Sequence, residues 1–88
     1  MSIMSSEIEE SIEILLSEAN PAHLSMIYPR EYEQLTGIIL DELTVDSDEK
    51  AISKVLTELF KDYYDLKIKK EELWRLSERI KEIIQKLA

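Results

Sequence analysis

The sequence contains no cysteine, one glycine, two prolines and one histidine among 88 residues. Without cysteine the chain has neither disulfides nor thiolate metal ligands. The absence of disulfides favours an intracellular localisation. A single glycine excludes the glycine-rich loops that cradle phosphates. No apolar run approaches the roughly 20 residues that a membrane span needs, and the acidic start is unlike a secretion signal. These absences predict a soluble, cytoplasmic protein without a membrane partner.

The residues that are present are typical of one small globular domain over residues 1–88. Apolar residues make up 44% of the chain, which is ordinary for a folded protein. The length lies near the lower end of the range in which a domain folds without disulfides, a bound metal or oligomerisation. The sequence is rich in isoleucine, lysine and glutamate and poor in glutamine and asparagine. That bias is typical of heat-adapted proteomes.

The first predicted helix begins near Ser6, which forms a capping box with Glu9. It ends at Asn20-Pro21, because the residue before a proline is pushed out of helical geometry. The same pair predicts a short helical turn after Pro21, with Asn20 as its cap. Residues at helical spacing predict the buried stripe of the first helix: Ile8, Ile12, Leu15, Leu16 and Ala19.

A second helix is predicted over roughly residues 29–44, with Pro29 in its first turn. Gly37 lies inside this helix and projects away from the apolar stripe. It either faces solvent or marks the close approach of another backbone, and the sequence leaves both alternatives open. The stripe comprises Tyr28, Tyr32, Leu35, Ile38, Ile39 and Leu43.

The stretch from Asp46 to Leu66 has the most complete apolar stripe, and Asp46 with Glu49 resembles a capping pair that opens its helix. Lys50, Lys54 and Lys61 point away from this stripe. The residues expected to be buried here are Ile52, Val55, Leu56, Leu59, Phe60, Tyr63 and Leu66.

A tight connection is predicted near residues 65–69, where the spacing of apolar residues changes. It is followed by a last helix from about Lys70 to Leu87, whose predicted buried stripe comprises Leu73, Leu76, Ile80, Ile83, Ile84 and Leu87. The alternative is one helix from Ser47 to the end, about 60 Å long, which would require an oligomer. Short connections between amphipathic helices favour antiparallel neighbours. The expected fold is all-α: a small up-and-down helical bundle of four main helices plus the short turn after Pro21.

Charge is distributed unevenly along the chain. Residues 1–50 carry twelve acids and two bases, a net charge of −10, whereas residues 51–88 carry seven acids and nine bases, a net charge of +2. The acidic half would repel phosphate, which argues against simple wrapping by nucleic acid. It would steer the protein towards a partner protein with a basic surface.

No residue pattern indicates catalysis, a metal site or a cofactor. His23 is the only histidine, so it lacks the companions that a metal site or an oriented base needs. Asp46-Ser47-Asp48 resembles the start of a calcium loop, but Ala51 and Thr57 stand where such a loop requires glycine and glutamate. The sequence therefore predicts a protein that is not an enzyme.

Some residues are candidates for binding a partner because they lie outside the predicted stripes. A large aromatic on a polar flank is typical of interface hot spots, although a wide buried face would also accommodate one that is half buried. If several such residues cluster, they form a patch larger than a monomer usually exposes. The apolar candidates are Trp74, Tyr64, Ile14 and Leu40, and the basic candidates on the last helix are Lys70, Arg75 and Lys81.

Three hypotheses for function follow from these surfaces. The first is an acidic helical protein-binding module, an accessory or regulatory subunit of a larger assembly such as a nucleic-acid-processing machine. The second is a nucleic-acid-associated factor that uses the basic last helix and stacks bases on Trp74 or Tyr64. The third is a self-associating module, in which the acidic half of one copy meets the basic half of another.

Overall fold

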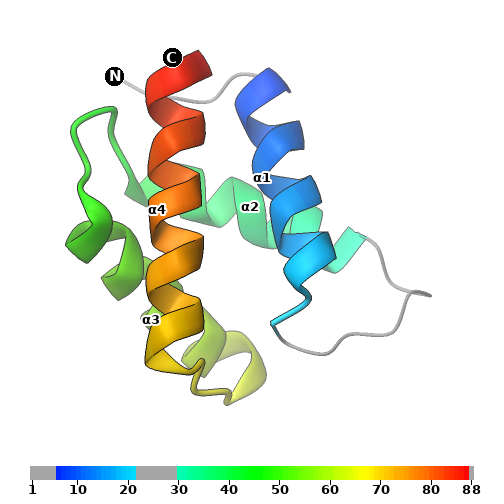
Figure 1. Ribbon diagram of the computed structural model, residues 1–88. Coiled ribbons are helices and arrows are strands. Elements are labelled where there is room, and N and C mark those ends of the chain that lie inside the picture. The colour runs from blue at the N-terminus through cyan, green and yellow to red at the C-terminus, as the bar shows by residue number, and fades with distance from the viewer. Residues whose placement is uncertain (1–5, 22–29, 88) are drawn as a thin grey trace.

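The computed structural model describes residues 6–21 and 30–87, which form four α-helices and no strand (Figure 1). The expected all-α bundle of four main helices is thereby confirmed. The short turn expected after Pro21, including His23, lies outside the described residues. The helices are α1 (Ser6–Ala19), α2 (Arg30–Glu42), α3 (Glu49–Tyr64) and α4 (Lys70–Leu87).

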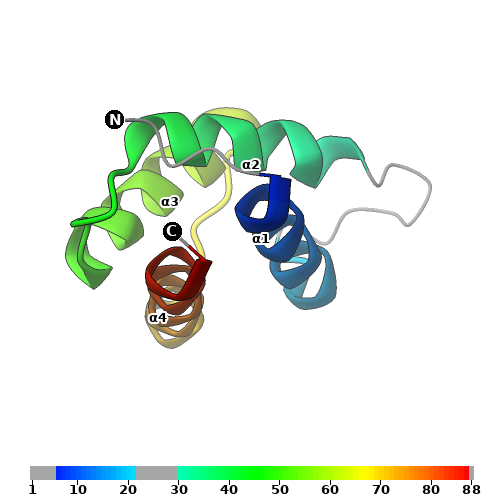
Figure 2. The ribbon, with the colours of Figure 1, turned by 90° about the horizontal axis from the view of Figure 1, so that it is seen from above.

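The four helices surround a common core. Helix α1 packs on α2 and α4, and α3 packs on α2 and α4. Helices α1 and α4 lie side by side and run in opposite directions, while α2 crosses them (Figures 1 and 2). Seen from above, α4 lies on the side of the molecule opposite α2, and it is adjacent to both α1 and α3 (Figure 2). Each helix therefore has two neighbours and one outward face.

The core is built from the predicted stripes of all four helices. Burial of these side chains stabilises the fold, because apolar area removed from water contributes about 25 cal/mol per Å². Helices this short depend on that packing. The buried apolar residues are Ile8, Ile12, Leu16, Tyr32, Leu35, Ile39, Leu40, Leu43, Ile52, Leu56, Phe60, Leu76, Ile80 and Ile84.

Helix α2 buries a wider band than its predicted stripe. Leu40, interpreted from the sequence as lying outside the stripe, is only 1% exposed, so that interpretation was wrong. Thr36 lies on the same side of the helix and is buried too, with its hydroxyl donating to the Tyr32 carbonyl at 2.6 Å. The band is wide because α2 packs against both α1 and α3.

Three residues predicted to be buried are exposed instead. Tyr63 is 59% exposed, and Ala19 and Leu87 are exposed as well. Each lies in the last turn of its helix, because α3 ends at Tyr64, α1 at Ala19 and α4 at Leu87. The stripe predictions were wrong there because the helices extend slightly beyond the core that covers them.

The ends of α1 and α3 share one conformation. Asn20 and Asp65 follow the two helices directly and both have positive φ, 43° and 49°. Asn20 donates its N–H to the Leu16 carbonyl at 2.7 Å, and Asp65 donates to Lys61 at 2.9 Å. Asn and Asp tolerate this left-handed conformation better than most residues. It stops α1 at the predicted place.

The connection predicted near residues 65–69 is confirmed, because these residues separate α3 from α4. The alternative of one long helix from Ser47 onwards is therefore wrong. Without proline or glycine, the chain turns here through the left-handed Asp65. The bond from the Asp65 N–H to the Lys61 carbonyl is the single 5→1 bond of an αL helix end, and the N–H of the next residue, Leu66, donates to the Phe60 carbonyl at 3.2 Å.

The N-cap of α3 is Asp48, not the predicted Asp46. The Asp48 carboxylate accepts a hydrogen bond from the Ala51 N–H at 2.9 Å. A preceding turn displaces the helix start by two residues: the Ser47 N–H donates to the Thr44 carbonyl at 3.1 Å, and the Ser47 hydroxyl accepts from the Thr44 N–H at 2.9 Å. Asp46 lies within this turn.

Gly37 adjoins open space. A Cβ added at this position meets no heavy atom within 4 Å, and the φ angle of Gly37 is not positive. Of the two alternatives that the sequence left open, the structure supports the one in which Gly37 faces solvent rather than another backbone.

Candidate partner-binding surfaces

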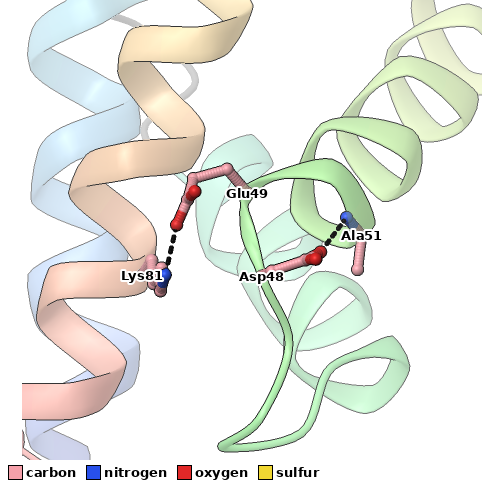
Figure 3. Close-up of polar contacts among 4 residues, drawn as sticks. All are labelled: Asp48, Glu49, Ala51 and Lys81. Atoms are coloured by element: carbon pink, nitrogen blue, oxygen red, sulfur yellow. Dashed lines mark hydrogen bonds and ion pairs between the residues drawn. The ribbon is translucent and has the colours of Figure 1, made fainter.

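Two polar contacts join α3 to α4 and fix how the helices are aligned. The hydroxyls of Ser53 and Ser77 lie 2.7 Å apart. The Lys81 ammonium lies 2.5 Å from a Glu49 carboxylate oxygen, as Figure 3 shows. From the Glu49–Lys81 contact to the Ser53–Ser77 contact, the residue number rises by four on α3 and falls by four on α4, so the two helices are antiparallel. These two contacts therefore show which residues of α3 and α4 lie at the same level along the pair of helices.

Trp74 lies on the flank of α4 that faces α3. It precedes Ser77 by three residues and Lys81 by seven, which places all three on one side of the helix. Because Ser77 and Lys81 contact α3, Trp74 borders the same contact, between the levels of Ser53 and Thr57. Its side chain is 44% exposed. The indole is thus partly covered and partly presented to solvent.

The lysines of α3 border this contact from the other side. Lys50, Lys54 and Lys61 recur with the same spacing on α3 as Lys70, Trp74 and Lys81 on α4. Their directions around α3 fall within roughly 40° of one another, about 60–100° from that of Ser53 on its solvent side. All three are exposed. We define the lysine–tryptophan face as Lys50, Lys54, Lys61, Lys70, Trp74 and Lys81.

One of these lysines already has a partner within the chain. The hydrogen bond to Glu49 raises the pKa of Lys81 above its ordinary value of 10.5. The pair is about one-third exposed at Lys81 and one-quarter at Glu49. Lys81 therefore closes one end of the lysine–tryptophan face, and its main contribution is to hold α4 against the start of α3.

A shallow hollow continues the face at its other end. It has a volume of about 360 Å³ and lies where α3 runs into the connection to α4. Leu66 is partly buried against the core and forms part of its wall. The hollow is lined by Thr57, Lys61, Asp65, Leu66 and Lys67.

The opposite half of the molecule is acidic. Helices α1 and α2 carry nine carboxylates, and their only basic residue is Arg30 at the start of α2. A groove of about 440 Å³ runs between them. It is lined by Ser6, Glu9, Glu10, Glu13, Glu33, Gln34, Thr36 and Gly37.

Glu13 is the carboxylate most affected by this environment. Partial burial raises the pKa of Glu13 above its ordinary value of 4.5, because desolvation disfavours the charged form. Neighbouring carboxylates raise it further by repulsion; they belong to Glu33, Glu10 and Glu9. The groove therefore holds negative charge at an energetic cost that a cation would offset.

Ile14 lies on the outward side of α1, opposite the buried stripe, and is 50% exposed. One turn away on either side lie Glu10 and Glu18, both exposed. An exposed isoleucine among carboxylates combines an apolar contact with negative charge. We define the acidic face as Glu7, Glu10, Glu13, Ile14 and Glu18 of α1 together with Glu33 of α2.

The groove between α1 and α4 carries charges of both signs. Its volume is about 370 Å³, with Leu15 and Leu76 contributing apolar wall. Arg75, one of the predicted partner-binding residues, lies here rather than beside Lys70 and Trp74. The groove is lined by Leu15, Ala19, Lys69, Glu71, Glu72, Arg75, Leu76 and Arg79.

The predicted apolar candidates do not form one patch. Leu40 is in the core and Ile14 is on the outward side of α1, whereas Trp74 lies on the flank of α4 that borders the contact with α3. Tyr64 is partly buried against the core, with its ring centroid 5.6 Å from that of Phe60. Trp74 and Ile14 therefore belong to two separate surfaces.

Sequence reasoning missed that Lys50, Lys54 and Lys61 share a surface with Trp74. Two features of the sequence together indicate this shared surface. One is the identical spacing of these residues on the two helices, and the other is the tight connection that makes the helices antiparallel neighbours. The groove beside Glu13 and Glu33 could not be predicted, because it depends on how α2 crosses α1. No residue spacing encodes that crossing.

Comparison with protein-family models, curated proteins and solved structures finds no match. Within residues 6–21 and 30–87, no group of three or more metal-ligating side chains converges on a common point. Nor is any helix in that part of the chain long and apolar enough to cross a membrane. The surfaces just described are therefore the basis for considering function.

Proposed function

We propose that the protein is a cytoplasmic, non-catalytic protein-binding module, an accessory subunit of a larger assembly, and that its acidic face holds a partner with a basic surface. The observation that carries the proposal is Ile14, half exposed at the centre of that face. An apolar anchor surrounded by complementary charge is the arrangement that produces interface hot spots.

The groove beside Ile14 supplies the second element of the interface. Desolvation raises the pKa of Glu13, and repulsion from Glu33, Glu10 and Glu9 raises it further, so a cation placed beside these carboxylates is favoured. A lysine or arginine side chain from the partner would relieve that repulsion while its apolar neighbour covers Ile14. The surrounding carboxylates would also accelerate encounter with a basic partner.

The test compares proteins captured from the native host by matched variants. Ile14→Ser removes the anchor, and Val45→Ser is its control, because Val45 is equally exposed at 48% but lies between α2 and α3. Glu10→Gln combined with Glu13→Gln reduces the charge, and Glu58→Gln combined with Glu78→Gln applies the same change to exposed sites on α3 and α4.

The proposal expects one basic protein to be captured by the wild type and both controls but not by the acidic-face variants. Capture should also weaken as salt is raised, because exposed charges are screened. A partner lost equally from variants and controls, or a wild type that binds only copies of itself in light scattering, would contradict the accessory-subunit proposal.

A further inference from the structure

We infer that the lysine–tryptophan face binds single-stranded nucleic acid, with backbone phosphates along the lysines and a base stacked on Trp74. This inference does not depend on the protein partner of the acidic face. It concerns the other side of the molecule, where α3 and α4 meet.

The geometry supplies a row of positive charge along α3, with Lys70 of α4 beside one end of it, because Lys81 is paired with Glu49. Lys50, Lys54 and Lys61 follow α3 over eleven residues, a length of about 16 Å at 1.5 Å per residue. On α4, Lys70 lies at the level of Lys61, because the Ser53–Ser77 contact aligns the antiparallel helices. Trp74 lies four residues after Lys70, at the level of residues 53 to 57 of α3 and therefore between Lys50 and Lys61 along the row. An aromatic surface is therefore flanked by cations on both sides.

The balance of charge on the face is positive. Lys50, Lys54, Lys61 and Lys70 are exposed and have no ion-pair partner within 4 Å among the described residues. Glu58 and Glu78 are exposed carboxylates at its outward margin, and Asp65 lies with Lys61 in the lining of the adjoining hollow. With Lys67 of the same hollow, five lysines against three carboxylates leave an excess of positive charge that attracts a polyanion, on a chain whose net charge is −8.

Trp74 decides between the classes of polyanion. An acidic peptide would satisfy the lysines but would leave the indole without a planar partner. A nucleotide satisfies both, since any base can stack on an aromatic ring, and each such stack contributes about 1–3 kcal/mol. The base must be unpaired to reach the indole, so the ligand is single-stranded.

The hollow beyond Lys61 extends the same surface. Thr57 and Lys61 of α3 line it, and Leu66 forms part of its wall. A volume of about 360 Å³ accommodates the sugar and base of a neighbouring nucleotide. Lys67, also in the lining, offers a further cation at that end.

Trp74 is the only tryptophan in the chain, so its intrinsic fluorescence reports on this face directly. The experiment titrates the full-length protein with an oligothymidylate of about 12 nucleotides at low salt. The inference expects saturable quenching. The logarithm of the association constant should fall with the logarithm of salt concentration at a slope of about −3, as expected for four phosphates neutralised on a single strand.

Two double variants separate local from global charge. Lys54→Gln with Lys61→Gln should reduce that slope by about 1.4, because two phosphate contacts are lost. Arg79→Gln with Lys86→Gln removes the same charge from exposed sites on the α1 side of α4 and should leave affinity and slope unchanged. With a labelled oligonucleotide, Trp74→Ala should weaken binding by about tenfold, which is the loss of one stack.

Three outcomes would overturn the inference. The first is the absence of quenching at low salt by the wild-type protein. The second is an equal loss of affinity in both double variants, which would mean that only net charge matters. The third is poly-glutamate binding as tightly as the oligonucleotide, which would assign the face to an acidic protein segment. Circular dichroism of each variant ensures that the comparison is between folded proteins.

Discussion

The hydroxyls of Ser53 and Ser77 are hydrogen-bonded at 2.7 Å across the contact between α3 and α4. Ser77 also donates to the Leu73 carbonyl at 2.8 Å, so Ser53 is the donor in the contact between the helices. Ser77 is fully buried, and no described buried side-chain polar atom lacks a partner. This pair sets how the lysines of α3 are aligned with Lys70 and Trp74 of α4, so the lysine–tryptophan face depends on it.

Replacing Ser77 with alanine should lower the free energy of unfolding by about 1 kcal/mol, the usual net value of a hydrogen bond. Ser53→Ala and the double variant complete a thermodynamic cycle, measured by chemical denaturation. Because the two hydroxyls share one bond, the double variant should cost less than the sum of the single variants. Strictly additive costs would show that the pair does not interact in solution.

Asp48→Ala should destabilise the protein by about 1 kcal/mol, because it leaves the Ala51 N–H at the start of α3 without its acceptor. Asp46→Ala is the matched control, since it removes the same charge two residues earlier, within the turn. Thermal unfolding monitored by circular dichroism distinguishes them. A larger loss at Asp46 would return the cap to the position expected from the sequence.

Leu40 and Ile14, both predicted from the sequence to be off-stripe, should behave differently when truncated. Leu40→Ala creates a cavity in the core and should cost about 2–5 kcal/mol. Ile14→Ala removes a half-exposed side chain and should change stability by less than about 0.5 kcal/mol. Denaturant titration of both variants tests the comparison, and similar costs at the two sites would disagree with the structure.

Glu13→Gln should stabilise the protein at neutral pH. A raised carboxyl pKa in the folded state means that folding favours protonated Glu13. This contribution is fully present below the ordinary value of 4.5 and is lost as the pH rises through the folded-state value. The gain in unfolding free energy over wild type should therefore shrink on acidification. Glu58→Gln, with the same charge change, controls for net charge; an equal pH profile for both variants would rule out repulsion in the groove.

Gly37→Ala should stabilise the protein by about 0.5–1 kcal/mol, because alanine has the higher helix propensity and restricts the unfolded chain. The added Cβ meets no heavy atom within 4 Å, so no steric cost offsets this gain. The rise in melting temperature provides the measurement. A fall would indicate a contact at this position that the structure does not contain.

Much of the fold followed from local patterns, whereas the surfaces followed only in part. The periodicity around Ile52, the stop at Asn20 and the connection near Asp65 are properties of short segments, so they could be predicted. The burial of Leu40 depends on two helices packing against α2, and the cap at Asp48 depends on the turn before it. The acidic face and the lysine–tryptophan face depend on how the helices pack together. The sequence shows which lysines and carboxylates are present, but it does not show which of them lie close together.

The most direct test of the central claim is the dissociation constant of the captured partner, purified and titrated against the wild type, Ile14→Ser and Val45→Ser. The acidic-face account predicts that Ile14→Ser weakens binding at least about tenfold, or 1.4 kcal/mol, while Val45→Ser binds like the wild type. Equal affinities for all three proteins would contradict it.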